Sequence, residues 1–362
     1  MRLNQKIDYW LLAPVVILLS LGLTTLASIN PAFFRSQLIS LFVAVIVFLI
    51  ITRIDYRAFK AIKKPLYFTS LVLLVIVLVI GIESRGAVRW IDLFGIRIQL
   101  SEIFKPLLVL AFAGFIADNK NLSLRTFFSV FVFLMPVILL IYLQPDLGNA
   151  LIYVIVFFLT LFTLGFSVRW FAFLLLPVML FAPLLWNMLH EYQRQRVLTL
   201  INPGNDPSGT SYNTIQALIA IGSGMFLGKG LGEGTQSGLR FLPERHTDFI
   251  FATISEGLGF VGGLIVILAF AFFFYRLYII FVNTHDLYDR TILICCFFFF
   301  LVQFFVNIGM NIGLLPVVGV TLPFVSFGGS SLVSSFIFLA IVSSISVSQK
   351  NKNDRSSIFT VE

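Results

Sequence analysis

The residue with the clearest chemical potential is Asp248, which lies where a polar segment meets a long apolar run. Residues 242–247 before it include Pro, Glu, Arg and His, and the residues after it are mostly apolar. A carboxylate at the mouth of a membrane-spanning helix can contact water and a polar substrate, while apolar residues beneath it can hold a lipid tail. The sequence therefore predicts chemistry at a membrane surface, centred on Asp248.

Three further ionisable residues lie in or beside apolar segments. Glu256 follows Asp248 by eight positions, which places the two within about 80° of each other around a helix, so both could line one cavity. Glu102 and Lys105 have a spacing at which helical side chains are neighbours, and this fits either a structural ion pair or a contact with substrate. Asp146, in a Gln-Pro-Asp-Leu-Gly turn, fits a helix N-cap, and a further role stays open.

Cations are concentrated in two segments that we expect on the same side as Asp248, residues 84–103 and 190–247. Long loops escape the charge rule of membrane insertion, so these cations could simply be tolerated. Alternatively they collect an anionic head group, as arginine forks do for phosphates. The cations in question are Arg85, Arg89, Arg97, Arg194, Arg196, Lys229, Arg240 and Arg245.

The composition defines the elements that must position these residues. Hydrophobic residues make up 59% of the chain and charged residues 12%, which is typical of a polytopic membrane protein. Continuous apolar runs of spanning length predict helices rather than strands, because lipid offers the backbone no hydrogen-bond partners. We therefore expect an all-α bundle of about ten transmembrane helices. The predicted spans are residues 9–29, 36–54, 66–83, 104–118, 126–143, 148–167, 169–189, 248–281, 291–314 and 321–348.

Lysine and arginine predict the orientation, since short cytoplasmic loops carry the positive excess. Residues 53–64 contain five Lys and Arg, and placing them in the cytoplasm puts both termini there, including a tail at residues 349–362. Asp248 and the large loop between the seventh and eighth helices, residues 190–247, then lie on the outer face. Within that loop, residues 213–227 are apolar enough to lie against the membrane or dip into it. Gly224 and Gly228 fit either a close helix contact or, as we favour, a flexible loop.

The remaining composition excludes other classes. The net charge of +8 does not indicate nucleic acid, because the cations are divided between the two sides of the membrane, where the inner ones suit anionic lipid. Cys295 and Cys296 are adjacent in an apolar run, which makes a structural disulfide or a metal site improbable. The first apolar run has spanning length and no small-residue cleavage site, so we expect it to be the first helix and not a signal peptide.

Five motifs occur in order along the chain: Gly-Ala-Val-Arg-Trp-Ile at 86–91, Ser-Glu-Ile-Phe-Lys-Pro at 101–106, Gln-Pro-Asp-Leu-Gly at 144–148, residues 242–252, and Pro-Phe-Val-Ser-Phe-Gly-Gly-Ser-Ser at 323–331. With them the chain resembles the SEDS family (shape, elongation, division and sporulation) of RodA and FtsW type over essentially its whole length, closer to the RodA branch. The resemblance implies one domain over residues 1–362 in the bacterial inner membrane. It also implies a peptidoglycan glycosyltransferase that polymerises lipid II and works with a class B penicillin-binding protein.

The resemblance further implies that Asp248 is the essential aspartate of the family and that Glu102 and Lys105 line the same cavity. We expect Asp248 to accept the proton of the attacking sugar 4-hydroxyl, with His246 a second candidate. Arg89, Lys105, Arg196 and Arg245 are candidates for binding the diphosphate, assisted by a divalent cation (Mg²⁺ or Mn²⁺) and by no organic cofactor.

Two positions depart from the family pattern. Leu100 replaces a proline, which affects only helix entry, and Glu256 is followed by Gly257 where a second acid is usual. Glu256 is therefore kept as a candidate substrate-binding residue, while any mechanism that needs two acids there is in doubt.

Two other functions stay open. A lipid II flippase needs similar polar residues, but here they gather toward one half of the membrane and no inverted repeat is evident. A noncatalytic scaffold for a transpeptidase would tolerate the loss of Asp248. The phenylalanine cluster at residues 297–300 is a candidate surface for a membrane partner, and lipid exposure fits it equally.

Overall fold

The computed structural model describes residues 7–84, 87–93, 96–119, 123–188, 194–195, 198 and 211–359. Within these ranges, eight helices are long and apolar enough to cross a membrane. They are α1 (Tyr9–Ile29), α2 (Pro31–Ile51), α4 (Lys63–Ile80), α5 (Leu100–Asp118), α6 (Leu124–Leu143), α13 (Ile250–Val282), α14 (Leu287–Asn311) and α15 (Gly329–Phe359).

Shorter helices complete this part of the chain. The apolar helices α7 (Leu147–Thr163) and α8 (Val168–Leu180) follow α6, and a turn at Phe181 separates α8 from α9 (Ala182–Met188). The others are α3 (Ala58–Ala61), α11 (Tyr212–Ser223) and α12 (Thr235–Gly238). Every predicted span overlaps one of these helices, so the predicted all-α membrane bundle is confirmed.

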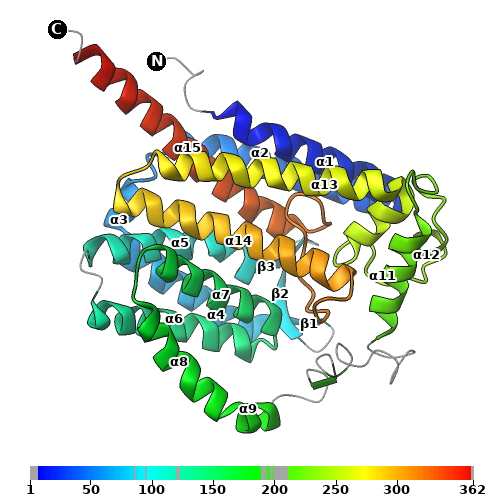
Figure 1. The fold of residues 1–362 in the computed structure, drawn as a ribbon, viewed down its shortest axis with the longest axis horizontal. Helices are drawn as coiled ribbons and strands as arrows, with labels where there is room; N and C mark the ends of the chain where they lie inside the picture. The colour runs from blue at the N-terminus through cyan, green and yellow to red at the C-terminus, as the bar shows by residue number, and fades with distance from the viewer. Residues whose placement is uncertain are drawn as a thin grey trace.

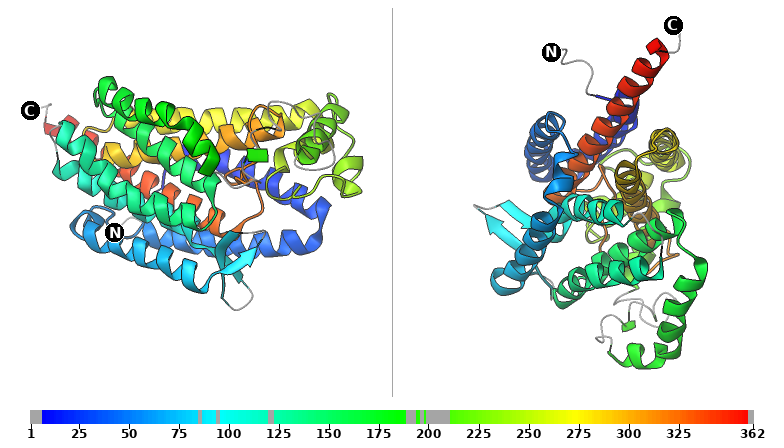
Figure 2. Two further views of the ribbon diagram at one scale, coloured as in Figure 1. Left: turned by 90° about the horizontal axis from the view of Figure 1, so that it is seen from below. Right: turned by 90° about the vertical axis from the view of Figure 1, so that its left-hand side faces the viewer.

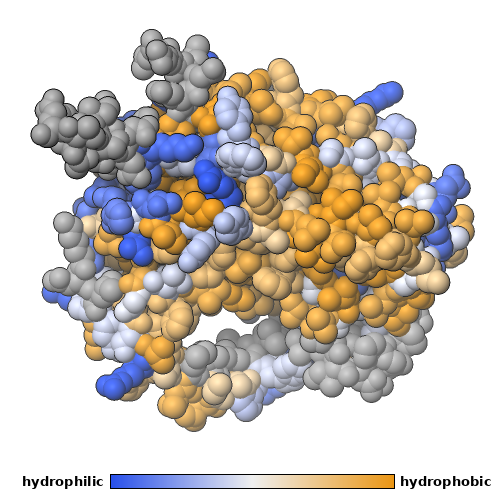
Figure 3. Space-filling model, turned by 45° about the horizontal axis from the view of Figure 1, so that its top comes forward, coloured by the Kyte–Doolittle hydropathy of each residue, from blue (hydrophilic) through white to orange (hydrophobic). Residues whose placement is uncertain are grey.

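The helices lie roughly side by side, with α1 beginning and α15 ending at one end of the bundle (Figure 1). The strands, α11 and α12 lie toward the opposite end (Figure 1). We call these the terminal end and the cavity end. Hydrophobic residues cover most of the face shown in Figure 3, and hydrophilic residues gather at its two edges. This distribution suits a bundle that spans a bilayer.

A small antiparallel sheet stands where the sequence predicted only a loop. It has the order β1-β2-β3, with β1 (Ile82–Ser84), β2 (Ala87–Leu93) and β3 (Ile96–Gln99). Ile96 and Ile98 alternate with polar residues in β3, which is the period of a strand. The pairing of Trp90 with Gln99 brings the end of β3 beside the middle of β2. Helix α5 then begins directly after β3, at Leu100, four residues before the predicted start.

Aromatic rings contact one another within an interior that is otherwise largely aliphatic. Phe300 of α14 lies 5.2 Å from Phe273 of α13 and 5.3 Å from Phe324, centroid to centroid. By contrast, α8 and α9 lie at the periphery when the bundle is viewed along its helices (Figure 2, right). The aromatic contacts of α8 with the bundle are made near its start, where Phe171 packs edge-on against Phe127 of α6 at 5.1 Å.

Two of the differences from the predicted spans come from non-helical backbone. The last span begins at Gly329 and not at residue 321, because Thr321 to Gly328 form a non-helical segment in which Phe324 has φ +65°. Helix α13 is interrupted at Gly259, whose φ of +66° is left-handed. Such a backbone is open to glycine and costly for other residues.

The preference for a flexible loop at Gly224 and Gly228 is wrong. At both glycines, a Cβ atom would clash with the α13 backbone, at Ser255 and Gly257 respectively. The amide of Gly230 also donates to the carbonyl of Gly257 at 2.9 Å. This part of the large loop is therefore a close backbone contact, because only glycine leaves room for it.

Candidate active site

A cavity of about 120 Å³ opens at the cavity end of the bundle. Its walls come from four parts of the chain that are far apart in sequence: the sheet with the start of α5, the start of α7, the segment before α13, and the segment before α15. The lining residues are Arg89, Trp90, Gln99, Glu102, Asn149, Glu244, Thr247, Asp248, Gly319, Thr321, Phe327, Gly328, Ser330 and Ser331. Of the predicted site residues, Asp248, Glu102 and Arg89 are thus brought together.

Asp248 lies two residues before the start of α13, and its backbone is held by two amides of α14. The side chains of Asn307 and Asn311 donate to the Asp248 carbonyl at 3.0 and 2.9 Å. The Asn311 side-chain oxygen also accepts from the amide of Ala252 at 3.0 Å, one of the N–H groups that the first turn of a helix leaves without a partner. Both asparagines are fully buried. They fix the start of α13 and therefore the direction of the Asp248 side chain.

The segment before α15 is tied to the residues on either side of the cavity. Ser326 donates to the Thr247 carbonyl at 2.7 Å and accepts from the amide of Leu322 at 2.8 Å. The amide of Phe327 donates to the His246 carbonyl at 2.9 Å. Polar groups of this glycine- and serine-rich segment therefore form a wall of the cavity next to Asp248.

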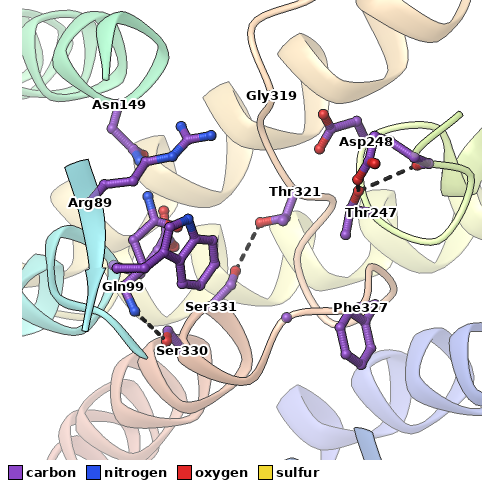
Figure 4. Close-up of a pocket in the computed structure, with 14 residues that line it drawn as sticks. Arg89, Gln99, Asn149, Thr247, Asp248, Gly319, Thr321, Phe327, Ser330 and Ser331 are labelled. Carbon is purple, nitrogen blue, oxygen red and sulfur yellow. Dashed lines mark hydrogen bonds between the residues drawn. The ribbon is translucent and has the colours of Figure 1, made fainter. Parts of the chain in front are cut away.

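The opposite wall carries Arg89. Its guanidinium lies 3.4 Å from Oδ1 of Asp146, while Oδ2 of Asp146 accepts from the side chains of Gln99 and Asn149 at 3.0 and 2.9 Å. Figure 4 shows Arg89 and Asp248 pointing into the cavity from opposite sides, with Gly319 and Thr321 between them. A cation and a carboxylate thus face one space.

Glu102 and Lys105 form a buried ion pair in the first turns of α5. Glu102 lines the cavity, whereas Lys105 contacts Glu102 and does not line it, so the predicted contact of Lys105 with a diphosphate stays a prediction. The turn is also held by Tyr153 of α7, whose hydroxyl donates to the Ser101 carbonyl at 2.9 Å. The three-residue spacing therefore places Glu102 and Lys105 in a structural ion pair, and Glu102 also faces the cavity.

Three further predicted residues do not line this cavity. Glu256 is fully buried and accepts from the amides of Gln236 and Ser237 at 2.8 and 2.9 Å, so it binds the large loop and does not line the cavity. His246 stacks on Phe33 with ring centroids 4.2 Å apart. The Arg245 side chain is partly buried, and burial followed by the charge of Arg240 lowers its pKa. Arg196 lies outside the described residues. The substrate-binding role of all four stays a prediction.

The structure does not supply a set of metal ligands. Within the described ranges, no three or more His, Cys, Asp or Glu side chains converge in a way that could hold a metal ion. Divalent cations of the magnesium type are bound mainly by oxygen ligands. The cavity offers these from Glu244 and Asp248 in the segment before α13 and from Glu102 at the start of α5. We therefore assign no metal ligands, and the need for Mg²⁺ or Mn²⁺ stays a prediction.

Sequence reasoning missed two residues that hold the site and one contact of a third. Asn307 and Asn311 are amides one helical turn apart in an apolar run, and such polar residues in a spanning helix are a signal that could have been used. Asp146 was predicted as an N-cap, which it is, since its Oδ1 accepts from the amide of Asn149 at 3.3 Å. Its contact with Arg89 could not be predicted, because that contact depends on the unpredicted sheet.

The fold and the site define a class: a multi-pass helical membrane protein with a polar cavity at one end of the bundle. A cation and a carboxylate face each other across that cavity. The chain belongs to the FtsW/RodA/SpoVE family, whose model, described as "Cell cycle protein", matches residues 5–351.

The relatives of known name are peptidoglycan enzymes. The chain is 41% identical over 309 residues to the peptidoglycan glycosyltransferase MrdB of Escherichia coli K12, covering 84% of this chain and 83% of that protein. It is 36% identical over 362 residues to a probable peptidoglycan glycosyltransferase FtsW of Trichlorobacter lovleyi, covering 95% and 94%. The higher identity to MrdB agrees with the predicted RodA-like branch.

Two solved structures have the same fold. One, titled "Structural coordination of polymerization and crosslinking by a peptidoglycan synthase complex", matches with a TM-score of 0.83 at 29% identity over 96% of this chain and 99% of that chain. The rod shape determining protein RodA of Thermus thermophilus matches with a TM-score of 0.72 at 27% identity, over 94% and 96%.

Proposed function

We propose that this protein is a peptidoglycan glycosyltransferase that polymerises lipid II during cell elongation. The single observation that carries the proposal is the placement of Asp248, whose carboxylate points into a cavity with Arg89 on the opposite wall. The identity to MrdB over most of both chains supports the reaction class.

Asp248 is the general base of the proposed reaction. The acceptor's N-acetylglucosamine 4-hydroxyl attacks the anomeric carbon of the donor's N-acetylmuramic acid while its proton passes to the Asp248 carboxylate. The bond from the anomeric carbon to the diphosphate breaks, and its electron pair leaves with the polyprenyl diphosphate. Direct displacement inverts the α-linked donor and gives a β-1,4 bond. The donor already carries its leaving group, so the protein needs only to position the reactants and stabilise charge.

Arg89 is the cation best placed to stabilise the departing diphosphate, because its guanidinium borders the cavity. Preorganised donors aimed at developing charge contribute most when they do not move during the reaction, and Asp146 holds Arg89 in this way. Glu102 contacts the sugar or its peptide from the side of α5, and Lys105 balances the charge of Glu102. Arg196, Arg245 and His246 bind the part of lipid II that extends beyond the cavity.

The proposed setting is the bacterial inner membrane, with the cavity end at the outer face and both termini in the cytoplasm. The Lys and Arg of residues 53–64, between α2 and the first turns of α4, support this orientation through the positive-inside rule. A class B penicillin-binding protein is the proposed partner. The match to a chain from a complex that coordinates polymerization and crosslinking supports it.

The test uses purified protein and fluorescently labelled lipid II. We expect long glycan chains from the wild-type protein and a loss of about 10²- to 10⁴-fold in Asp248→Asn, the usual cost of removing a general base. Asp118→Asn, which alters a carboxylate in an ion pair with Lys63 at the terminal end of α5, is the matched control and should polymerise normally.

Vesicles containing the protein distinguish the alternatives. Translocation of labelled lipid II without any polymer would favour a flippase. Polymer formed at the wild-type rate by Asp248→Asn would refute the proposed mechanism. A protein that makes no polymer, and whose Asp248→Asn variant still supports its transpeptidase partner as well as the wild type does, would favour a scaffold.

A further inference from the structure

The segment that follows α11 carries three apolar side chains that the rest of the protein leaves uncovered. Met225, Phe226 and Leu227 expose 79%, 65% and 76% of their surface. They are adjacent in sequence, whereas exposed apolar residues on a water-soluble loop are usually scattered. Three adjacent exposed apolar side chains indicate a surface that contacts another apolar phase or molecule.

The backbone of this segment is fixed to the break in α13. The carbonyls of Met225 and Phe226 accept from the amides of Phe260 and Val261 at 2.9 and 3.3 Å. In the other direction, the amide of Lys229 donates to the Glu256 carbonyl at 3.0 Å. The interruption at Gly259 leaves some N–H and C=O groups of α13 without their helical partners, and these bonds replace them. Backbone polar groups inside a membrane need such partners, because lipid offers none.

The depth of the segment follows from the pairing of α1 with α13. The two helices are pinned at the terminal end, where Arg276 contacts Asp8 at 2.6 Å, directly before α1. Phe260 lies 16 residues from Arg276, and Thr24 lies 16 residues from Asp8 on the antiparallel helix. Phe260 is therefore level with Thr24, which is five residues, or about 7 Å, inside the end of α1.

Phe226 shares that depth because its ring stacks on the ring of Phe260, with centroids 5.8 Å apart and planes within 20°. Helix α1 has 21 residues, about the length that crosses the hydrocarbon of a bilayer. A ring level with Thr24 thus lies inside the hydrocarbon. Phe260, Leu264 and Leu268, spaced four residues apart, are all exposed and continue the same apolar face along α13.

We infer that Met225, Phe226 and Leu227 form a wedge that is inserted among the acyl chains of the leaflet at the cavity end. Their partner is lipid and not a protein or a second copy of the chain, because the wedge lies within the depth of α1 and continues the exposed face of α13. Lys229, whose ammonium donates to Thr235 at 3.2 Å, marks the polar boundary above the wedge, as lysines at membrane interfaces do. The wedge anchors the large loop at a fixed height, and so fixes the height of the segment that leads to Asp248.

A spin label on a cysteine measures this depth in the full-length protein in vesicles of phosphatidylethanolamine and phosphatidylglycerol. The two natural cysteines are completely buried, and unsubstituted protein shows their background. The test site is Phe226→Cys. Phe305→Cys, exposed on the spanning helix α14, is the lipid reference, and Glu233→Cys, exposed on the large loop, is the water reference.

We expect the label at residue 226 to collide with oxygen several-fold more often than with a water-soluble nickel chelate, as at residue 305. The opposite ratio, matching residue 233, overturns the inference, and so does a label that neither reagent reaches, because a protein surface would then cover it. In a second measurement the label is placed at Leu227→Cys. Adding Phe226→Glu should move it toward water while Phe226→Leu should not, and equal behaviour of the two variants contradicts the wedge.

These measurements do not depend on the proposed reaction. A protein without polymerase activity gives the same collision ratios if the wedge is in lipid, so failure of one proposal leaves the other intact.

Discussion

Charged side chains form buried or partly buried contacts at both ends of this bundle, but they are used differently. At the terminal end, Asp8 accepts from Arg276 and from Ser346, both at 2.6 Å, and Arg57 donates to Asp289 at 3.1 Å. Asp8 borders no described cavity and joins the start of α1 to α13 and α15. At the cavity end, Arg89, Glu102 and Asp248 border an open space.

This difference shows when a buried charge in a membrane protein indicates a functional site. Ionisable residues in spanning segments are functional candidates because they are costly. The terminal end shows that a charge can instead be satisfied within the protein, where loss of one partner leaves the other uncompensated. A second criterion is therefore needed, namely whether the charge borders a cavity. Asp248 and Arg89 meet it, and Glu256 does not.

After loss of Asp248 itself, we expect the largest fall in polymerisation from loss of Arg89. Arg57 is the matched comparison, because each of the two arginines pairs with an aspartate. Arg89→Ala should lower polymerisation about 10²- to 10³-fold, the typical cost of removing one preorganised donor for developing charge. Arg57→Ala should leave the rate nearly unchanged. It should lower stability by at least about 1 kcal/mol, because Arg57 is partly exposed but Asp289 is fully buried and loses its cation. The measurements are glycan synthesis from labelled lipid II and thermal unfolding in detergent.

Asp146→Asn sharpens the same comparison. Asparagine keeps the N-cap of α7 but removes the charge that orients Arg89, so we expect about a tenfold loss of activity by the same electrostatic argument. The double variant with Arg89→Ala should be no worse than Arg89→Ala alone, since the two residues act together. Additive losses would show that Asp146 does not act through Arg89.

The helices were predictable because each has a long apolar run, and lipid leaves the backbone no other choice. The sheet was not, because β1 and β3 have only three and four residues, too short for alternation to stand out from a loop. The start of α5 was missed for the same reason, since β3 leads directly into it. Local patterns thus predicted the bundle and missed the connections between its helices.

The candidate site was predictable in part. The family resemblance placed Glu102 and Lys105 in one cavity with Asp248. The structure brings Glu102 and Arg89 together with Asp248, whereas Lys105 does not line the cavity. The extrapolation to Glu256 assumed a regular helix from Asp248 onward, but α13 begins at Ile250 and Glu256 accepts from amides of the large loop. A helical projection shows which residues share a face of one helix. It cannot show which segment packs against that face, which here is the large loop against Glu256.

Asn311→Ala should have a moderate effect on both stability and activity. It leaves the buried amide of Ala252 without its side-chain partner, and an unsatisfied buried group costs about 1–3 kcal/mol. Activity should fall as well, because the Asp248 backbone loses one of its two amide contacts. The matched control is Asn283→Ala, which removes an exposed amide at the other end of α13, and it should change neither quantity. Equal behaviour of the two variants would contradict the positioning role of Asn311.

The smallest effect on polymerisation is expected for Asp8→Asn, which removes a carboxylate at the terminal end. Burial alone would raise the pKa of Asp8, but the hydrogen bonds from Arg276 and Ser346 outweigh it and hold the pKa below its ordinary value of 3.8. A lowered pKa in the folded state means that the charged form stabilises the fold. This contribution is complete above pH 3.8 and is lost as the pH falls through the folded-state value.

The stability difference between wild-type protein and Asp8→Asn should therefore be greatest near neutral pH and should shrink as the pH falls below 3.8. Thermal unfolding measured across this range checks the sign, since a difference that grows on acidification would mean that Asp8 is not stabilised in its charged form. Near neutral pH, the variant that remains folded should make glycan at the wild-type rate, because Asp8 does not line the cavity of Asp248 and ties α1 to α13 and α15. A loss of activity in folded Asp8→Asn would contradict the assignment of a purely structural role to the charges at the terminal end. It would mean that an ion pair at that end affects the chemistry at the cavity end.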